Sequence, residues 1–216
     1  MRVLVYGDSN SWGYLDDGLV LRFADRWPVE MARALAAQGR PVELVEECLP
    51  GRTTNLTDPK MGDFVDGASP FEAILRSHIP LDLILIMLGT NDVKAHFGRS
   101  TDEIIGGLMA LSDIVAASEV WPGPDPVGAR LGFIAPPVLG PKADDPGWDI
   151  EAGWVGSRAK TEVLPDKIEA ACRLRGHLFF DGNHGATSSD RDPIHWNEAT
   201  HVRMGAAVAE WVLKAL

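Results

Sequence analysis

Positive charge and long apolar runs are both scarce in this sequence. It contains 20 lysines and arginines against 31 aspartates and glutamates, which gives a formal net charge of -11 at pH 7. The electrostatic field of a chain with this net charge repels phosphate backbones and anionic membrane surfaces, so we expect no nucleic-acid and no membrane partner. The longest uninterrupted apolar stretch, 83–88, has six residues, whereas a membrane-spanning helix needs about 20.

Cysteine is the next scarce residue, with only Cys48 and Cys172 in the chain. One lies in a predicted strand and the other in a predicted helix, so we interpret them as two buried thiols rather than a disulfide pair. Only six residues precede the first polar motif, which leaves no room for a secretory signal peptide. We therefore expect a cytoplasmic protein.

Motifs for nucleotides and metals are also missing. The sequence contains neither the dinucleotide-binding pattern G-x-G-x-x-G nor the P-loop pattern G-x-x-x-x-G-K. Five histidines show no spacing typical of metal ligands, and we interpret them as solvated or structural: His78, His96, His177, His184 and His201. We expect no metal and no cofactor.

The composition itself is ordinary for a soluble globular protein, with 45% hydrophobic and 24% charged residues. A chain of 216 residues is long enough to bury one continuous core. We therefore expect a single domain over residues 1–216. Short β-rich runs predict five strands, at 2–6, 42–48, 81–88, 130–135 and 177–180.

Amphipathic stretches between these runs predict helices over 26–39, 69–79, 100–118, 157–175 and 197–216. Ser69 and Glu72 have the spacing of a capping box, Asn197 is a candidate N-cap, and Pro165 predicts a break or kink. Strands that alternate with helices indicate an α/β fold. We expect a flavodoxin-like, doubly wound parallel sheet of five strands in an α/β/α sandwich, with strand order 2-1-3-4-5.

Polar residues follow the first three predicted strands. The loops read "GDSNS" at 7–11, "LPGRTTN" at 49–55 and "GTND" at 89–92. In a doubly wound sheet, ligands bind beyond the carboxyl ends of the strands at the point where strand order reverses. We therefore expect the three loops to converge on one crevice, together with "DPIHWNE" (192–198), where Asp192 can orient His195.

A serine, a histidine with its own acid and a separate amide are what acyl transfer requires. A neutral imidazole accepts the proton of the attacking hydroxyl, and Asp192 would hold one tautomer of His195. The oxyanion that forms needs preorganised donors, for which the backbone N–H groups of Ser9 and Gly51 and the side-chain amide of Asn91 are candidates. The residues alone leave the choice between Ser9 and Ser11 open.

These four blocks resemble those of the SGNH (GDSL-type) hydrolase family, in the order "GDSNSWG", "PGRTTN", "GTND" and "DPIH". Within that family, "GRTTN", "PLDLILIMLGTND" and "KAHF" resemble the arylesterase and acyltransferase branch. The resemblance implies Ser9 as the nucleophile, Gly51 and Asn91 as further oxyanion donors, and His195 with Asp192 as base and orienting acid. Asn10 departs from the family motif, which commonly has leucine there.

Long loops and aromatic residues suggest the pocket and an assembly. We expect functional loops at 50–69 and 136–156 and a Pro/Gly-rich connector at 121–128. Asp8 and Asp92 are interpreted mainly as acceptors that brace loops. Aromatic side chains in or near the loops, and the resembling branch, favour a homo-oligomer; they are Phe64, Phe71, Trp148 and Trp154. The candidate pocket residues are Asp8, Asn10, Trp12, Trp148, Trp154 and Ile194.

The resulting hypothesis is a serine esterase that acts on small carboxylic esters, with short acyl and aryl or alkyl groups, through an acyl-enzyme. Acyl transfer to alcohols or peroxide is expected as a side activity. Two alternatives remain: a flavodoxin-like module that binds phosphate or flavin without hydrolase activity, and a catalytically inactive scaffold domain. Asp8 argues against the first, because a carboxylate beside the helix start would repel phosphate.

Overall fold

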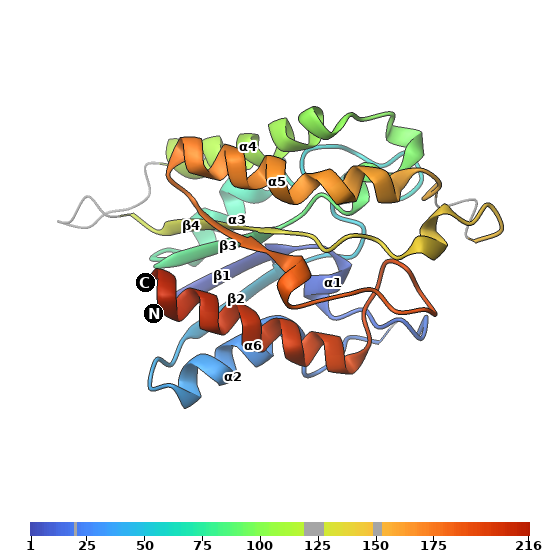
Figure 1. Ribbon diagram of the computed structural model, residues 1–216. Helices are drawn as coiled ribbons and strands as arrows, with labels where there is room; N and C mark the ends of the chain where they lie inside the picture. Colours follow the sequence, from blue (N-terminus) through green and yellow to red (C-terminus); the bar gives the residue numbers. More distant parts are fainter. Residues whose placement is uncertain (20, 119–127, 149–152) are drawn as a thin grey trace.

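Five parallel strands form one sheet in the order β2-β1-β3-β4-β5 (Figure 1). The computed structural model describes residues 1–19, 21–118, 128–148 and 153–216. The observed order is the predicted one, and the bounds agree with the predicted strands to within a few residues. The strands are β1 (Arg2–Gly7), β2 (Glu43–Cys48), β3 (Leu83–Met87), β4 (Arg130–Ala135) and β5 (Leu178–Asp181).

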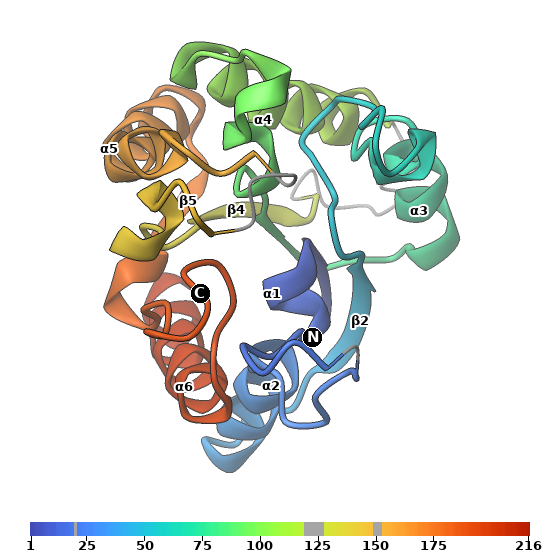
Figure 2. The same cartoon turned by 90° about the vertical axis from the view of Figure 1, so that its right-hand side faces the viewer.

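Helices cover both faces of this sheet, which confirms the α/β/α sandwich. Figure 2 shows α2 and α6 on one side of the sheet and α3, α4 and α5 on the other. The short α1 follows β1 directly at the end of the sheet. The helices are α1 (Ser9–Trp12), α2 (Trp27–Ala37), α3 (Phe71–His78), α4 (Thr101–Ala117), α5 (Ser157–Arg175) and α6 (Glu198–Ala215).

The two core layers follow from the alternation of side chains along each strand. In β1, Leu4 and Tyr6 belong to the cluster under α3, α4 and α5, whereas Val3 and Val5 belong to the cluster under α2 and α6. All five residues of β3 are buried. A central parallel strand is covered on both faces, which is why its sequence is a continuous apolar run.

The caps at the helix N-termini agree less well with the sequence predictions than the bounds of the strands do. No side chain caps α3, because Ser69 donates its hydroxyl hydrogen bond to Asp66 Oδ2 (2.6 Å) instead. The predicted capping box at Ser69 is therefore wrong, and a capping box occurs at Ser100 and Glu103, before α4. The Asn197 cap on α6 is confirmed by its bond from the Thr200 N–H (2.9 Å).

The structure also shows the helix around Pro165 and the state of the two cysteines. α5 continues through Pro165 and is not broken there. Cys48 is half-buried and Cys172 is buried, and both are free thiols, as predicted except for the partial exposure of Cys48. Most of the predicted connector at 121–128 and part of the loop at 136–156 lie outside the described residues.

Strand register explains how separate loops reach one place. Gly7, at the end of β1, pairs with Cys48 of β2 and with Met87 of β3. Three strands therefore end at the same level of the sheet. The polar loops that follow them begin side by side, which positions the site described next.

Candidate active site

Ser9 is the first residue of α1, and it follows β1 after a single intervening residue. Its Oγ lies 3.1 Å from Nε2 of His195, within hydrogen-bond distance. The two residues are far apart in the chain, and Figure 2 shows α1 beside the loop that leads into α6. Ser9 is 5% exposed, so its hydroxyl is shielded from bulk water but remains reachable.

The carboxylate of Asp192 is hydrogen-bonded to the second ring nitrogen of His195. Nδ1 of His195 lies 2.6 Å from Asp192 Oδ2. The second oxygen, Oδ1, accepts the backbone N–H groups of Ile194 (2.7 Å) and His195 (3.1 Å). Partial burial raises the pKa of Asp192, but the hydrogen bonds and charge of His195 and these N–H groups outweigh it and lower the net pKa. The carboxylate is thus kept ionised beside the imidazole.

Ser11 lies elsewhere and serves the packing of the core. It is fully buried, and its Oγ accepts a hydrogen bond from Nε1 of Trp27 (3.3 Å). The N-cap of α1 is Asp8, which accepts the N–H of Asn10 (3.1 Å). Of the two serines, it is Ser9 that contacts the histidine.

The candidate oxyanion donors come from the three neighbouring loops. Ser9 is the first residue of a helix, so its N–H has no intrahelical acceptor. Gly51 has φ +83°, a left-handed conformation that favours glycine, in the turn after β2. Nδ2 of Asn91 donates to the carbonyl of Arg52 (3.1 Å). That bond orients the amide and leaves its second N–H for another acceptor.

Asp8 and Asp92 accept hydrogen bonds from loop groups, as predicted for bracing residues. Asp92 is fully buried and receives the N–H and the hydroxyl of Thr54 and the guanidinium of Arg99 (2.6 Å). Asp8 is also fully buried. Burial raises the pKa of both carboxyl groups, that of Asp8 to about 6.

Asn10 and Ile194, two of the pocket candidates, form a direct bridge. Nδ2 of Asn10 donates to the carbonyl of Ile194 (3.1 Å). Both residues are buried. This bond joins the helix that carries Ser9 to the segment that carries His195, so the residue that departs from the family motif has a clear structural role here.

The tryptophan candidates differ from one another. Trp12 is half-buried, with the Arg22 guanidinium 5.8 Å from its ring centroid. Trp148 is partly buried against the core, and Trp154 is only 6% exposed with Nζ of Lys94 over its ring at 5.2 Å. Phe71 is fully buried as well. The expectation of a large exposed aromatic surface is therefore wrong for Phe71 and Trp154, because their rings fill the core.

Tyr14 is the neighbour of His195 that the sequence reasoning missed. Its ring lies 4.4 Å from the imidazole, tilted by 38°. Tyr14 follows Gly13, which adopts φ +97° and reverses the chain after α1. Nothing in the spacing of Tyr14 and His195 along the chain predicts this contact.

A charged cluster beside Asn91 was missed too. Buried Asp58, from the loop after β2, faces Nε2 of His96 (3.4 Å) and Nζ of Lys94 (3.8 Å). The "KAHF" segment therefore ties the loop after β2 to the loop after β3. Its members are spaced too irregularly in sequence to predict this contact.

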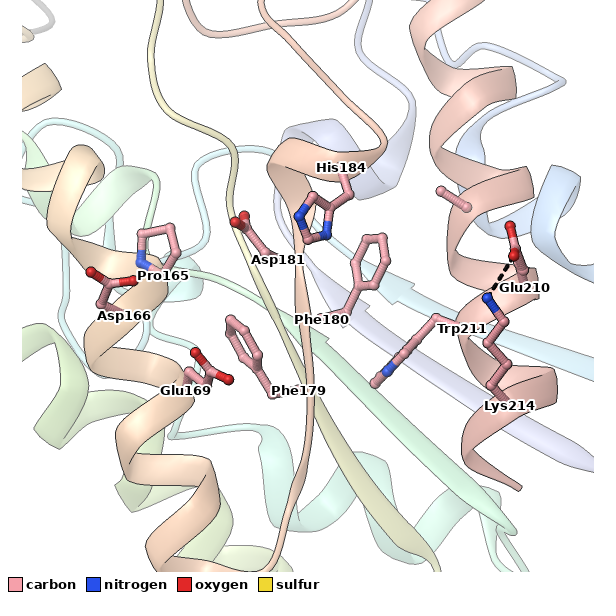
Figure 3. Close-up of a pocket in the computed structure, with 11 residues that line it drawn as sticks. Pro165, Asp166, Glu169, Phe179, Phe180, Asp181, His184, Glu210, Trp211 and Lys214 are labelled. Carbon is pink, nitrogen blue, oxygen red and sulfur yellow. Dashed lines mark hydrogen bonds and ion pairs between the residues drawn. The ribbon is translucent and has the colours of Figure 1, made fainter.

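A separate cavity of about 540 Å³ lies between α5, β5 and α6 (Figure 3). Phe179, Phe180 and Trp211 line it, and the Glu210–Lys214 ion pair (2.7 Å) lies on its α6 side. None of the candidate site residues lines it. Because it opens at the edge strand and not at the loops after β1, β2 and β3, it takes no part in the geometry around Ser9.

No group of three or more metal-ligating side chains occurs in the described part of the chain. Within the same ranges, no helix combines the length and the hydropathy that crossing a membrane requires.

A known protein family and solved structures resemble this chain over nearly its whole length. The model of the GDSL-like lipase/acylhydrolase family matches residues 5–203. The solved aryl esterase of M. smegmatis is 35% identical, with 100% of this chain and 99% of that chain covered and a TM-score of 0.88. A carbohydrate acetylesterase from Sinorhizobium meliloti is 32% identical, with the same coverage and TM-score. No curated protein sequence matched the chain.

A third solved structure, a putative arylesterase from Agrobacterium tumefaciens, is 30% identical, with 100% and 99% of the two chains covered and a TM-score of 0.83. Two more distant structures, at 17% and 18% identity, share the fold alone. The similarity therefore extends over the entire chain and includes all four polar blocks.

Proposed function

From the premise that this chain belongs to the GDSL-like lipase/acylhydrolase family, we propose that it hydrolyses small carboxylic esters through an acyl-enzyme on Ser9. The observation that carries the proposal is the continuous chain of hydrogen bonds from Ser9 Oγ through His195 to Asp192. Carboxylic ester hydrolysis is the activity of the family. The substrate class, the covalent intermediate and the residue roles are the parts proposed here.

In the acylation step, Ser9 Oγ attacks the ester carbonyl while Nε2 of His195 accepts its proton. Asp192 fixes the tautomer with the proton on Nδ1 and stabilises the imidazolium that forms. The N–H groups of Ser9 and Gly51 and the free amide N–H of Asn91 stabilise the oxyanion. His195 then protonates the departing alcohol, and water repeats the sequence to release the acid.

We infer a preference for short acyl groups from the neighbours of Ser9. Tyr14 packs on His195, and Asn10 bonds the carbonyl of Ile194, so these side chains occupy space around the nucleophile and its base. The similar proteins are described as an aryl esterase and a carbohydrate acetylesterase. Both descriptions are compatible with acetyl esters of aryl or alkyl alcohols as substrates of this chain.

Covalent labelling tests the nucleophile. An organophosphonate should label the wild-type chain at Ser9, and Ser9→Ala should abolish both labelling and turnover, lowering kcat by roughly 10⁶-fold. Ser11→Ala is the matched control, since it removes a neighbouring hydroxyl that bonds Trp27. Peptide mapping that places the adduct on Ser11 would overturn the assignment.

Acyl transfer is the second part of the proposal. The Tyr14 ring against His195 gives the crevice an apolar side, which favours an alcohol or peroxide over bulk water as the acceptor. An aryl acetate supplied with a few per cent of benzyl alcohol should yield benzyl acetate at early times. Acetate as the only product, with no acceleration of phenol release by the alcohol, would mean plain hydrolysis.

Self-association is the third part. Although Phe71 and Trp154 are buried, exposed apolar side chains remain elsewhere: Leu19 and Leu21 follow α1, and Phe64 lies in the loop after β2. Burial of such side chains between copies would lower the free energy of an oligomer. Light scattering should give a mass above that of the 23.4 kDa chain at micromolar concentration, and the monomer mass would contradict the proposal.

A further inference from the structure

We propose that Met61 is a modification site coupled to the reaction: a peracid formed on Ser9 transfers one oxygen atom to the Met61 thioether, and the resulting sulfoxide slows the enzyme. The inference rests on the proposed acyl transfer to hydrogen peroxide. It concerns a residue for which the hydrolytic mechanism has no use.

Met61 lies directly against the candidate oxyanion glycine. A methyl group placed on the Cα of Gly51 would be 2.4 Å from Cε and 2.6 Å from Sδ of Met61. Since such a methyl carbon is about 2.5 Å from the nitrogen of its own residue, the sulfur lies within about 5 Å of the Gly51 nitrogen. The thioether therefore packs on the residue whose N–H is the candidate donor to the carbonyl oxygen.

The loop holds Met61 in this place through Asp58. The carbonyl of Asp58 accepts the N–H groups of Met61 (3.1 Å) and Gly62 (2.6 Å). The Asp58 carboxylate accepts the N–H of Lys60 (2.9 Å) and faces His96 (3.4 Å). Asp58 itself is 1% exposed. The turn that carries Met61 is thus anchored to buried structure, and the contact with Gly51 follows from it.

Exposure selects two of the six methionines as oxidisable. Met61 is 40% exposed and Met1 is 41% exposed. The other four are at most 8% exposed: Met31, Met87, Met109 and Met204. Met1 precedes β1, whereas Ser9 follows it, so the length of the strand separates Met1 from the site by about 20 Å. Met1 is therefore an internal control of equal exposure.

The chemistry balances in two steps. Hydrogen peroxide attacks the acyl-enzyme, its proton passes to His195 and then to Ser9 Oγ, and a peracid leaves. The sulfur of Met61 then attacks the outer peroxide oxygen. The O–O bond breaks, an S–O bond forms, and the peracid is reduced to the carboxylic acid as the thioether is oxidised to the sulfoxide.

The product would interfere where oxyanion stabilisation occurs. A sulfoxide oxygen is a strong hydrogen-bond acceptor, and at this distance it competes with the substrate carbonyl for the N–H of Gly51. The expected consequence is a fall in kcat that increases with the number of peracid turnovers.

Peptide mass spectrometry tests this inference. Wild type and Ser9→Ala are incubated with hydrogen peroxide, with and without phenyl acetate, and with excess free methionine to consume peracid that escapes into solution. In wild type with ester, sulfoxide at Met61 should exceed sulfoxide at Met1 several-fold. Without ester, or in Ser9→Ala, the two positions should be oxidised to a similar extent.

Met61→Leu is the variant for a second test, which measures activity during the incubation. This variant keeps an apolar side chain of similar size that cannot be oxidised, so it should retain its own initial rate through the incubation while wild type slows. Equal oxidation of Met1 and Met61 during peracid formation, or equal slowing of both proteins, overturns the inference alone. Hydrolysis of phenyl acetate with no peracid formed overturns it together with the acyl-transfer proposal, and no hydrolysis overturns the proposed function.

Discussion

The loop after β1 and the segment before α6 each bring a carboxylate near His195, and the two carboxylates have opposite surroundings. Asp192 is partly exposed, bonds the imidazole and accepts two backbone N–H groups. Asp8 is fully buried and accepts one backbone N–H in the helix cap. Proximity to the histidine therefore does not make the two residues equivalent.

The difference appears in the direction of the two pKa shifts. Burial raises the pKa of Asp8 to about 6, because the hydrogen bonds and the charge of His195 that oppose the rise do not outweigh the lost solvation. At Asp192, burial acts the same way, but the bonds and charge of His195 outweigh it. Asp92 is a third case, in which burial raises the pKa although Arg99 is bound. The two fully buried carboxyl groups, Asp8 and Asp92, therefore have raised pKa values, whereas that of Asp192 is lowered.

The largest expected effect is on catalysis at Asp192. Asp192→Asn should lower kcat by about 10⁴-fold with little change in KM, because the amide favours the wrong histidine tautomer. Asp8→Asn is the matched control and should lose far less. The measurement is the steady-state rate on phenyl acetate for the two variants. Equal losses would erase the distinction between the two carboxylates.

The next effect is on stability at Asp92. Asp92→Asn leaves the nearly buried Arg99 guanidinium without its carboxylate, and we expect a loss of about 3 kcal/mol in the free energy of unfolding. Glu210→Gln, which breaks the exposed pair with Lys214, should cost less than about 1 kcal/mol. Urea titrations of both variants give the comparison. A loss no larger than that of Glu210→Gln would contradict a structural role for Asp92.

The smallest expected effect is the pH dependence that titration of Asp8 gives to the free energy of unfolding. Its folded pKa of about 6 lies above the 3.8 of a solvent-exposed aspartate, so the folded state binds the proton more tightly than the unfolded state. Stability is then lost as pH rises from about 4 to 6, by roughly 3 kcal/mol at most. Asp8→Asn should remove this slope. Unfolding free energies of both proteins at several pH values test it, and identical slopes would rule out titration of Asp8.

Much of the site was predictable because its motifs occupy strand ends. The strand order places the loops that carry Ser9, Gly51 and Asn91 beside one another, and register at Gly7 aligns them. The late Asp192 and His195 were recognisable from their spacing. Tyr14, Met61 and the Asp58 cluster were not, because each is defined by a contact between segments whose separation in the chain has no regular pattern.

Local pattern by itself determined the alternation of strands and helices, the buried central strand and the four polar blocks, since these depend on residues close together in the chain. Only the tertiary structure decided that Ser9 and not Ser11 contacts His195, that Trp154 and Phe71 are core residues, and that Asp8 and Asp192 have opposite pKa shifts. The physical reason is that burial and hydrogen-bond partners are set by chain segments that fold against one another, and a residue's identity does not specify which segment that is.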